Sequence, residues 1–314
     1  MTFSIVALDQ ATGDIGVAVQ SKFLAVGSVV PWAKADVGAV ATQSFANVAY
    51  GPDGLALLAT GAPAQEVLDR LVAGDDLRGE RQVGIVDAHG GAATHTGGGC
   101  FDWAGGRTGR GFAAQGNILA GPEVVDGLAD TFLAGGAPFP ELLVRCLSAA
   151  DGAGGDRRGR ESAALLVVRA AGGYGGGNDR WIDLRVDDHP DPIAELGRLL
   201  DLHRLYLDRP TVEELTPIDA GTAVELRRDL DQLGAGPGGR TTTVYVRMHP
   251  ELDESGGARP LIGQPRAVPA GWNEEWHEAL LDWMSVENLE ERSAALGWID
   301  PRVREVLRLR ARSS

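Results

Sequence analysis

The sequence predicts an α+β protein with a four-layer αββα sandwich, followed by a small and mainly helical C-terminal domain. Apolar runs of strand length come in hairpin pairs, which indicates mostly antiparallel pairing. These runs lack a regular polar alternation, so we expect both faces of each sheet to be covered. Pairs of helical segments follow the strands, and helices outside two stacked sheets would provide that cover.

Along the chain, the expected strands alternate with pairs of helices. Residues 3–8 and 15–20 form a hairpin across a Gly-containing loop. Further strands are expected at 26–30, 37–45, 82–96 (a hairpin that turns at His89, Gly90 and Gly91), 112–119, 162–170 and 180–188. Helices are expected at 53–60, 63–73, 121–134, 138–150 and 192–207. Pro63 suits the first position of a helix, and Gly74 suits a helix end.

The composition changes near Arg209 and Pro210, where we place a domain boundary. Residues 1–210 would form the sandwich and residues 211–314 the helical domain. Helices are expected there at 219–233, 273–284 and 301–311, with a Gly- and Pro-containing insertion at 236–271. Four of the seven tryptophans lie in this part: Trp272, Trp276, Trp283 and Trp298.

The composition argues against several classes of protein. A net charge of −15 argues against nucleic acid or an anionic membrane as a partner. No apolar run approaches the roughly 18 residues of a membrane span, and no secretory signal is recognisable, so we expect a cytoplasmic protein. Cys100 and Cys146 make no disulfide framework, and the histidines have no clear ligand spacing, so we expect no metal and no cofactor.

Thr2 lies directly before the first strand, at the second position of the chain. Methionine aminopeptidase removes Met1 when the next side chain is small, and Thr2 would then carry a free amine beside its hydroxyl. An α-amine has a pKa of about 7.7–8.0, so it can act as a base near neutral pH. A threonine activated by its own amine is an established nucleophile. The alternative is a threonine that merely starts a surface strand.

The opening stretch resembles the start of the N-terminal-nucleophile hydrolases, in which a Thr, Ser or Cys nucleophile precedes a strand, a turn and a second strand. A closer similarity, over residues 2 to about 208, is to an uncharacterised bacterial family of the same clan. Some of its members carry a C-terminal peptidoglycan-binding domain, which residues 224–234 and 272–292 resemble. The stretches that carry the family similarity are 21–33, 38–44, 115–124, 154–168 and 183–196.

This resemblance implies roles for particular residues. Thr2 matches the nucleophile, and Lys34 falls near the lysine that lowers the nucleophile's pKa in proteasome-type enzymes. Lys22 falls where those enzymes carry an arginine, and we favour it because its surroundings belong to the closer family similarity. Gln20 replaces their second-strand acid, and the Thr-Ser-Thr-Gly-Gly signature of the asparaginase type is absent. The alternative for each lysine is a solvated surface charge.

Polar side chains at strand ends are candidates for substrate binding. Amides there can donate to an oxyanion or to a carboxylate, and an arginine can bind a carboxylate through two hydrogen bonds. The alternative is that they bind loop backbone or stay exposed. The candidates are Gln43, Ser44, Asn47, Gln115, Asn117, Asp156, Arg158 and Ser162.

The functional hypothesis is an amidohydrolase that cleaves a C–N amide bond of a small peptide-like or amino-acid-derived substrate. One alternative is a non-catalytic ligand-binding protein on the same fold. Another is a protein that binds peptidoglycan fragments (muropeptides) through the C-terminal tryptophans, although such residues often fill the core of a small domain. Hydrolases of this clan commonly assemble, so we expect a homo-oligomer without nucleic-acid or membrane partners.

Overall fold

The computed structural model describes residues 2–239 and 261–314. The chain divides into two compact units, Met1–Asp201 and Leu202–Ser314, which are described separately. The boundary expected near residue 211 lies within the second unit, beyond the end of α5 (Pro192–Tyr206). The insertion expected at 236–271 lies partly outside the described residues.

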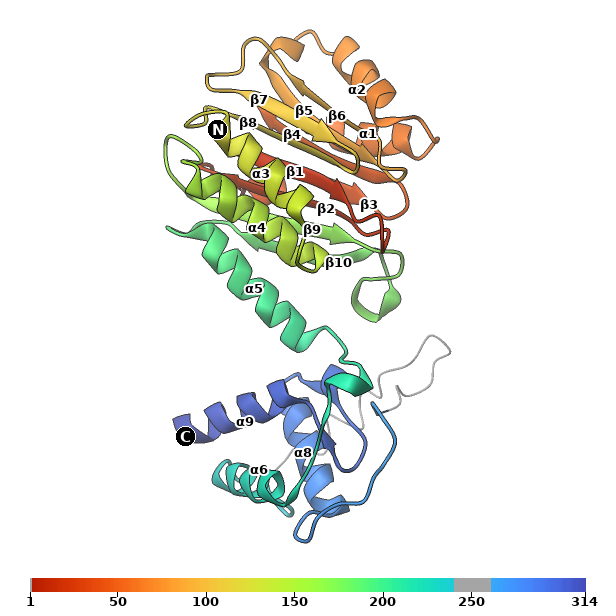
Figure 1. Cartoon of the computed structure of the whole chain (residues 1–314), viewed down its shortest axis with the longest axis vertical. Coiled ribbons are helices and arrows are strands. Elements are labelled where there is room, and N and C mark those ends of the chain that lie inside the picture. The colour runs from red at the N-terminus through yellow and green to blue at the C-terminus, as the bar shows by residue number, and fades with distance from the viewer. Residues whose placement is uncertain (1, 240–260) are drawn as a thin grey trace. The chain divides into compact units, whose positions relative to one another are not determined.

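The first unit contains a six-stranded sheet in the order β10-β9-β2-β1-β8-β7, and all its neighbouring strands are antiparallel. Its strands are β1 (Thr2–Leu8), β2 (Ile15–Ser21), β7 (Gly105–Gly109), β8 (Phe112–Asn117), β9 (Ser162–Val168) and β10 (Arg180–Val186). β7 was not among the expected strands, because its Gly-rich segment has no strand-like apolar run. β1 lies in the interior of the sheet, between β2 and β8 (Figure 1).

A second sheet has four antiparallel strands in the order β3-β4-β5-β6. They are β3 (Pro31–Lys34), β4 (Gly38–Ser44), β5 (Arg81–Asp87) and β6 (Ala92–Thr96). The strand expected at 26–30 is wrong: Val26–Ser28 is the 3-10 helix η1. Ala25 adopts a left-handed conformation there (φ 54°), and the Ser162 hydroxyl accepts the Val26 N–H, so the backbone turns instead of pairing.

Helices cover one face of each sheet (Figure 1). Helices α3 (Glu123–Ala134) and α4 (Phe139–Gly152) pack on the six-stranded sheet, and α1 (Tyr50–Leu58) and α2 (Ala64–Ala73) on the four-stranded one. Short 3-10 helices, η2 (Arg78–Glu80) and η3 (Tyr174–Gly176), lie in the connections. The result is a mixed α+β structure with antiparallel sheets and a helical C-terminal region, as the sequence predicts.

Burial on both faces explains why the strands lack polar alternation. Along β1, Phe3 and Ile5 belong to the core that contains α3 and α4. Val6 and Leu8 belong to a separate core, between the two sheets. Because every residue of β1 is buried, an apolar run without alternation is the stable pattern for this strand.

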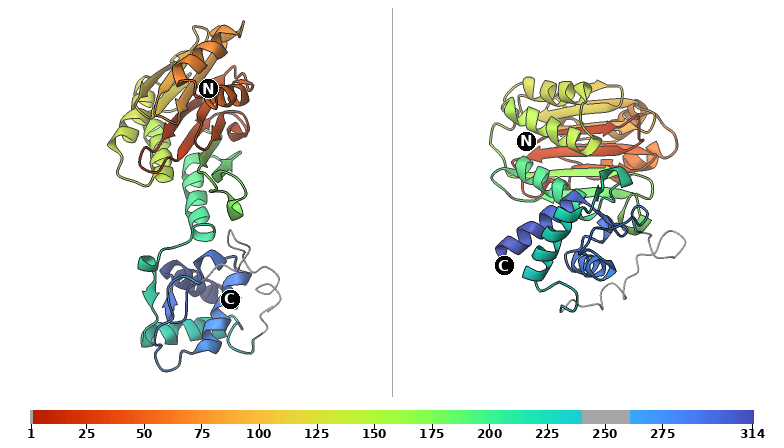
Figure 2. Two further views of the ribbon diagram at one scale, coloured as in Figure 1. Left: turned by 90° about the vertical axis from the view of Figure 1, so that its right-hand side faces the viewer. Right: turned by 60° about the horizontal axis from the view of Figure 1, so that its bottom comes forward.

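The second unit is mainly helical, with α6 (Ala220–Gln232), α8 (Glu274–Val286) and α9 (Pro301–Ser313). Helices α6 and α9 lie side by side (Figure 2). Asp219, Asn273 and Asp300 cap these helices by accepting backbone N–H groups, as residues of this kind commonly do. The remaining elements are η4 (Val212–Glu214), η5 (Glu290–Arg292), β11 (Thr216–Pro217) and β12 (Trp298–Ile299).

Candidate active site at the ends of the strands

Thr2 is the first residue of β1, and the strand register defines its neighbours. Thr2 pairs with Asn117 on β8 and with Ser21 on β2, and Ser21 pairs in turn with Ser162 on β9. Side chains directly opposite one another share a face of the sheet. Thr2 shares its face with Val6, so this row of four polar residues faces the second sheet.

The hydroxyl of Thr2 is held in place by its neighbour on β2. Thr2 Oγ1 lies 3.0 Å from Ser21 Oγ, and either oxygen can donate. Thr2 is 6% exposed and Ser21 is fully buried, so little water competes for this contact. The backbone carbonyl of Thr2 accepts a hydrogen bond from Gln43 Nε2 at 3.3 Å. Hydrogen bonds therefore hold both the hydroxyl and the backbone carbonyl of Thr2 in position.

Behind Thr2, a buried amide network joins the two sheets. Gln43 Nε2 donates to Gln82 Oε1 at 2.9 Å, and Asn117 Nδ2 donates to the same oxygen at 2.9 Å. Ser4 Oγ donates to Gln43 Oε1 and accepts from Gln115 Nε2, each at 2.7 Å. Because burial strengthens satisfied hydrogen bonds and penalises broken ones, this network makes the strand ends rigid.

Gly84 on β5 makes room for that network. A Cβ atom at this position would lie 2.0 Å from Gln115 Oε1. Any larger residue would therefore push the Gln115 amide away from Ser4, which explains a glycine in the middle of a strand.

The structure brings one of the two candidate lysines to the end of the sheet that holds Thr2. Lys22 follows Ser21 directly, and its Nζ pairs with Glu161 at 3.4 Å on the surface. Lys34 ends β3 opposite Gly38, whereas Ser44, six residues further along β4, lies at the Thr2 end. At ~3.3 Å per residue, this spacing places Lys34 about 20 Å from that end.

Gln20 lies on the opposite face of the sheet from Thr2. It pairs with Phe3, whose side chain belongs to the core under α3 and α4. Gln20 is fully buried, and both its side-chain polar atoms lack a hydrogen-bond partner within the part of the chain that the structure describes. It therefore does not occupy the place of an acid aimed at Thr2.

Most candidate binding residues make hydrogen bonds inside the protein. Gln43 and Gln115 belong to the amide network. Asp156 accepts the backbone N–H groups of Lys22 (3.0 Å) and Arg158 (2.8 Å), and the Arg158 guanidinium lies 3.5 Å from the same carboxylate. The Ser162 hydroxyl accepts the Val26 N–H. These side chains shape the loops around Thr2.

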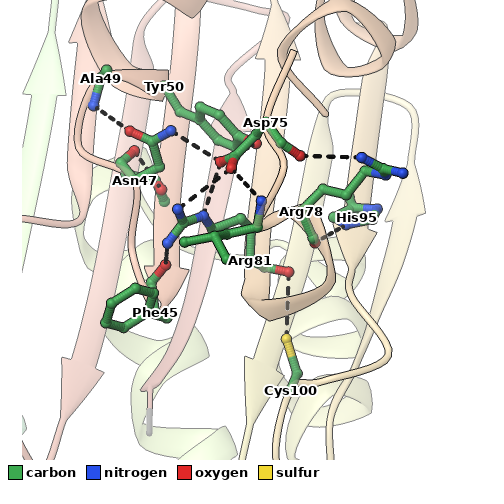
Figure 3. Close-up of polar contacts among 11 residues, drawn as sticks. Phe45, Asn47, Ala49, Tyr50, Asp75, Arg78, Arg81, His95 and Cys100 are labelled. Carbon is green, nitrogen blue, oxygen red and sulfur yellow. Dashed lines mark hydrogen bonds and ion pairs between the residues drawn. The ribbon is translucent and has the colours of Figure 1, made fainter. Parts of the chain in front are cut away.

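A second polar cluster lies beside the candidate site, around Asp75 (Figure 3). Asp75 Oδ2 accepts hydrogen bonds from Arg81 Nε at 2.9 Å, Asn47 Nδ2 at 3.0 Å and Tyr50 Oη at 3.0 Å. The Arg81 hydrogen bond holds the pKa of Asp75 well below its usual range. Burial, followed by the hydrogen bond to Asp75, raises the pKa of Tyr50 to about 12. This cluster fixes the loop after β4, where Ser44 ends the strand with a φ of 67°.

Ser21 and Gln82 were not among the candidate residues, although the sequence contains a signal for Ser21. A hairpin loop sets the register of its two strands. Leu8 pairs with Ile15 across the first loop, so counting outward from the loop puts Ser21 opposite Thr2. Gln82 had no such signal. It lies opposite Gln43 on a strand that no hairpin loop joins to β4, and its contact with Asn117 crosses between the two sheets.

These features define a class: an α+β protein whose antiparallel sheets enclose a threonine and an amide network at one end, with a separate helical unit. The chain belongs to the family described as "Family of unknown function (DUF1028)", whose model matches residues 2–196. Residues 264–307 match the model described as "Putative peptidoglycan binding domain".

One solved structure of the same family is similar to this chain. The crystal structure of protein SPO2555 from Silicibacter pomeroyi, assigned to the same family, is 31% identical and has a TM-score of 0.59. The similarity covers 65% of this chain and 89% of that chain. No curated protein matches.

Within residues 2–239 and 261–314, no helix has the length and apolar character needed to cross a membrane. The same ranges contain no group of three or more His, Cys, Asp or Glu side chains placed to hold a metal ion.

Proposed function

We propose that the first unit is an N-terminal-nucleophile amidohydrolase with an αββα sandwich, and that Thr2 becomes its nucleophile once Met1 is removed. The observation that carries this proposal is the buried Thr2 hydroxyl, which lies 3.0 Å from Ser21 Oγ at the end of an interior strand. A reactive group on a rigid sheet keeps its geometry better than one on a loop. The substrate would be a small peptide-like or amino-acid-derived amide.

In this mechanism, the α-amine of Thr2 takes the proton of its own hydroxyl through a water molecule. Oγ1 then attacks the amide carbonyl, and the tetrahedral intermediate collapses as the leaving amine takes the proton from the Thr2 ammonium. The acyl group stays on Oγ1 as an ester, and a water activated by the same amine releases it. We assign the oxyanion to the second N–H of Asn117, since its first N–H donates to Gln82.

Lys22 and Lys34 have smaller roles in this proposal than the resemblance implies. The ammonium of Lys22 pairs with Glu161, so the field that it exerts at Thr2 is partly cancelled. Lys34 lies at the far end of its sheet and receives no role. The proton transfers therefore fall to the terminal amine.

The proposal predicts that the native protein lacks Met1 and carries one reactive residue. Intact-mass measurement should show a chain short by one methionine, and a β-lactone probe should add a single acyl group at Thr2. A retained Met1 in the native protein contradicts the terminal-amine mechanism. A processed chain that is not acylated favours the alternative, a non-catalytic ligand-binding protein on this fold.

A second candidate function, for the helical unit, is binding of a peptidoglycan fragment, which the family match to residues 264–307 favours. Trp272 and Trp283 fill the core of this unit. Trp276 and Trp298 are only partly buried, and the guanidinium groups of Arg227 and Arg266 lie 4.9 and 4.7 Å from their ring centres. A ring with an adjacent cation suits a sugar that carries a carboxylate.

We expect the full chain to bind a soluble disaccharide-peptide of peptidoglycan, and Trp298→Ala to weaken that affinity about tenfold. Titration calorimetry provides the measurement. Trp181→Ala is the matched control, because Arg169 lies 3.7 Å from the Trp181 ring in the first unit, outside the matched region. Equal losses in the two variants, or no binding by the wild type, would remove this candidate.

A further inference from the structure

Exposed apolar side chains of the first unit gather around Thr2. Eight large apolar residues are exposed between residues 2 and 201. Only Leu133 and Tyr174 lie elsewhere, in α3 and in the β9–β10 connection. The other six, which we call the apolar rim, lie on loops at the Thr2 end: Phe23, Leu24, Phe45, Val48, Leu77 and Phe101.

The register of the strands places these loops together. Strands β2 and β4 end at Ser21 and Ser44, where β1 and β5 begin, and β6 ends at the same edge. Hydrogen bonds then join neighbouring loops: Phe45 N–H donates to Glu80 O at 3.2 Å, and Ile118 N–H donates to Phe101 O at 2.9 Å. The rim is therefore formed by segments that are distant in sequence and adjacent in the fold.

Hydrogen bonds hold the backbone of Phe45 and Phe23 in position, although the side chains of both residues are exposed. Arg81 Nη1 donates to the carbonyl of Phe45, and its guanidinium lies 5.1 Å from the Phe45 ring (Figure 3). Nε of the same guanidinium donates to Asp75 Oδ2. The Ser162 hydroxyl donates to the carbonyl of Phe23, so a residue of the strand-end row also holds the rim. Rigid apolar surfaces lose little entropy when a ligand covers them.

Several of the charged groups at this end are engaged with one another. Lys22 pairs with Glu161, and Arg158 with Asp156. Arg81 pairs with Asp75, and its side chain is 8% exposed. A charged substrate group would have to compete with these pairs, whereas an uncharged apolar group would find open rings at Phe23, Phe45 and Phe101, which are 53%, 65% and 71% exposed.

We propose that the substrate carries an uncharged aromatic or bulky aliphatic side chain on the acyl side of the cleaved amide, and that the apolar rim binds it. This inference rests on the proposed function, because Thr2 defines where the amide lies. Binding of the side chain and cleavage of the amide are nevertheless separate properties, and each can be measured without the other.

Binding is measured on Thr2→Ala, which keeps the rim and removes the nucleophile. Titration calorimetry with N-acetyl-phenylalanine amide and N-acetyl-alanine amide should show at least about tenfold tighter binding of the phenylalanine compound. The aspartate analogue should bind no better than the alanine one. Equal affinities for phenylalanine and alanine amides would overturn the inference.

Substitutions in the apolar rim test whether its residues cause the tighter binding of the phenylalanine amide. Phe45→Ala and Phe23→Ala should each weaken binding of the phenylalanine amide about tenfold and leave the alanine amide unchanged. Tyr174→Ala, an exposed aromatic residue elsewhere on the first unit, is the matched control and should change neither. Equal losses in Tyr174→Ala would contradict a role of the rim.

Two further measurements separate this inference from its alternatives. Wild-type protein that binds the phenylalanine amide but releases no ammonia from it would contradict the proposed hydrolase and keep the binding preference. Sedimentation of wild type and Phe45→Ala tests whether a second copy of the chain covers the rim. A change of assembly in Phe45→Ala, without a change in amide affinity, would overturn the substrate assignment.

Discussion

Replacing Thr2 by Ala is expected to lower kcat/KM by at least about 10³-fold for whichever amide the wild type hydrolyses. The change removes Oγ1, the only atom of the proposed mechanism that forms the acyl ester. The hydrogen bond from Gln43 goes to the backbone carbonyl of residue 2 and would remain. The loss should therefore appear in kcat, with folding and substrate binding unchanged. Steady-state kinetics and circular dichroism provide the two readouts.

Two variants make that result interpretable. Thr2→Ser keeps a hydroxyl and an amine on the terminal residue, so it should keep activity within about tenfold of the wild type. Thr12→Ala removes a hydroxyl that hydrogen-bonds Asp9 and Asp14 in the first hairpin loop, and it should behave as the wild type. Activity of Thr2→Ala near that of Thr12→Ala would contradict Thr2 as the nucleophile.

Replacing Asp75 by Ala should destabilise the first unit by about 3–5 kcal/mol. The Arg81 side chain is 8% exposed, so the substitution leaves a buried guanidinium without its carboxylate. Asn47 and Tyr50 lose the same acceptor. Urea denaturation, monitored by tryptophan fluorescence, measures the free energy of unfolding. A separate unfolding transition is fitted for each of the two units.

The difference in the free energy of unfolding between wild type and Asp75→Ala should also depend on pH. Because the folded pKa of Asp75 lies below its usual range, the ionised form stabilises the fold. That stabilisation is complete above the ordinary carboxyl pKa of about 3.9 and declines as the pH falls toward the lowered folded value. The difference between wild type and Asp75→Ala should therefore be constant near neutral pH and shrink in acid.

Asp69→Ala is the control for this experiment. Asp69 lies on α2 and accepts a hydrogen bond from exposed Gln65, so its loss should cost less than about 1 kcal/mol. A similar small cost for Asp75→Ala, or a difference from wild type that stays unchanged in acid, would contradict a stabilising Asp75–Arg81 pair.

Local pattern was enough to predict the strands that are buried on both faces. β1 and β2 are continuous apolar runs around a short loop, and such a hairpin has one natural register. The prediction failed at Val26–Ser28, where the apolar pattern is that of a strand but the backbone turns at Ala25. A hydrogen bond from Val26 N–H to Ser162, 136 residues away, accompanies that turn, and no local pattern contains it.

The sequence by itself determined the class of the protein, its main hairpins and Thr2 as the residue of interest, because these depend on short-range pattern. Tertiary structure decided which side chains surround Thr2. Lys22 and Lys34 are close in sequence, yet one lies at the Thr2 end and the other at the far end, because β3 runs away from the Thr2 end and Lys34 is its last residue. Gln43 and Gln82 lie opposite each other on neighbouring strands of one sheet, and Asn117 lies on the other sheet. They meet because stacking the two sheets leaves buried polar groups only one another as partners.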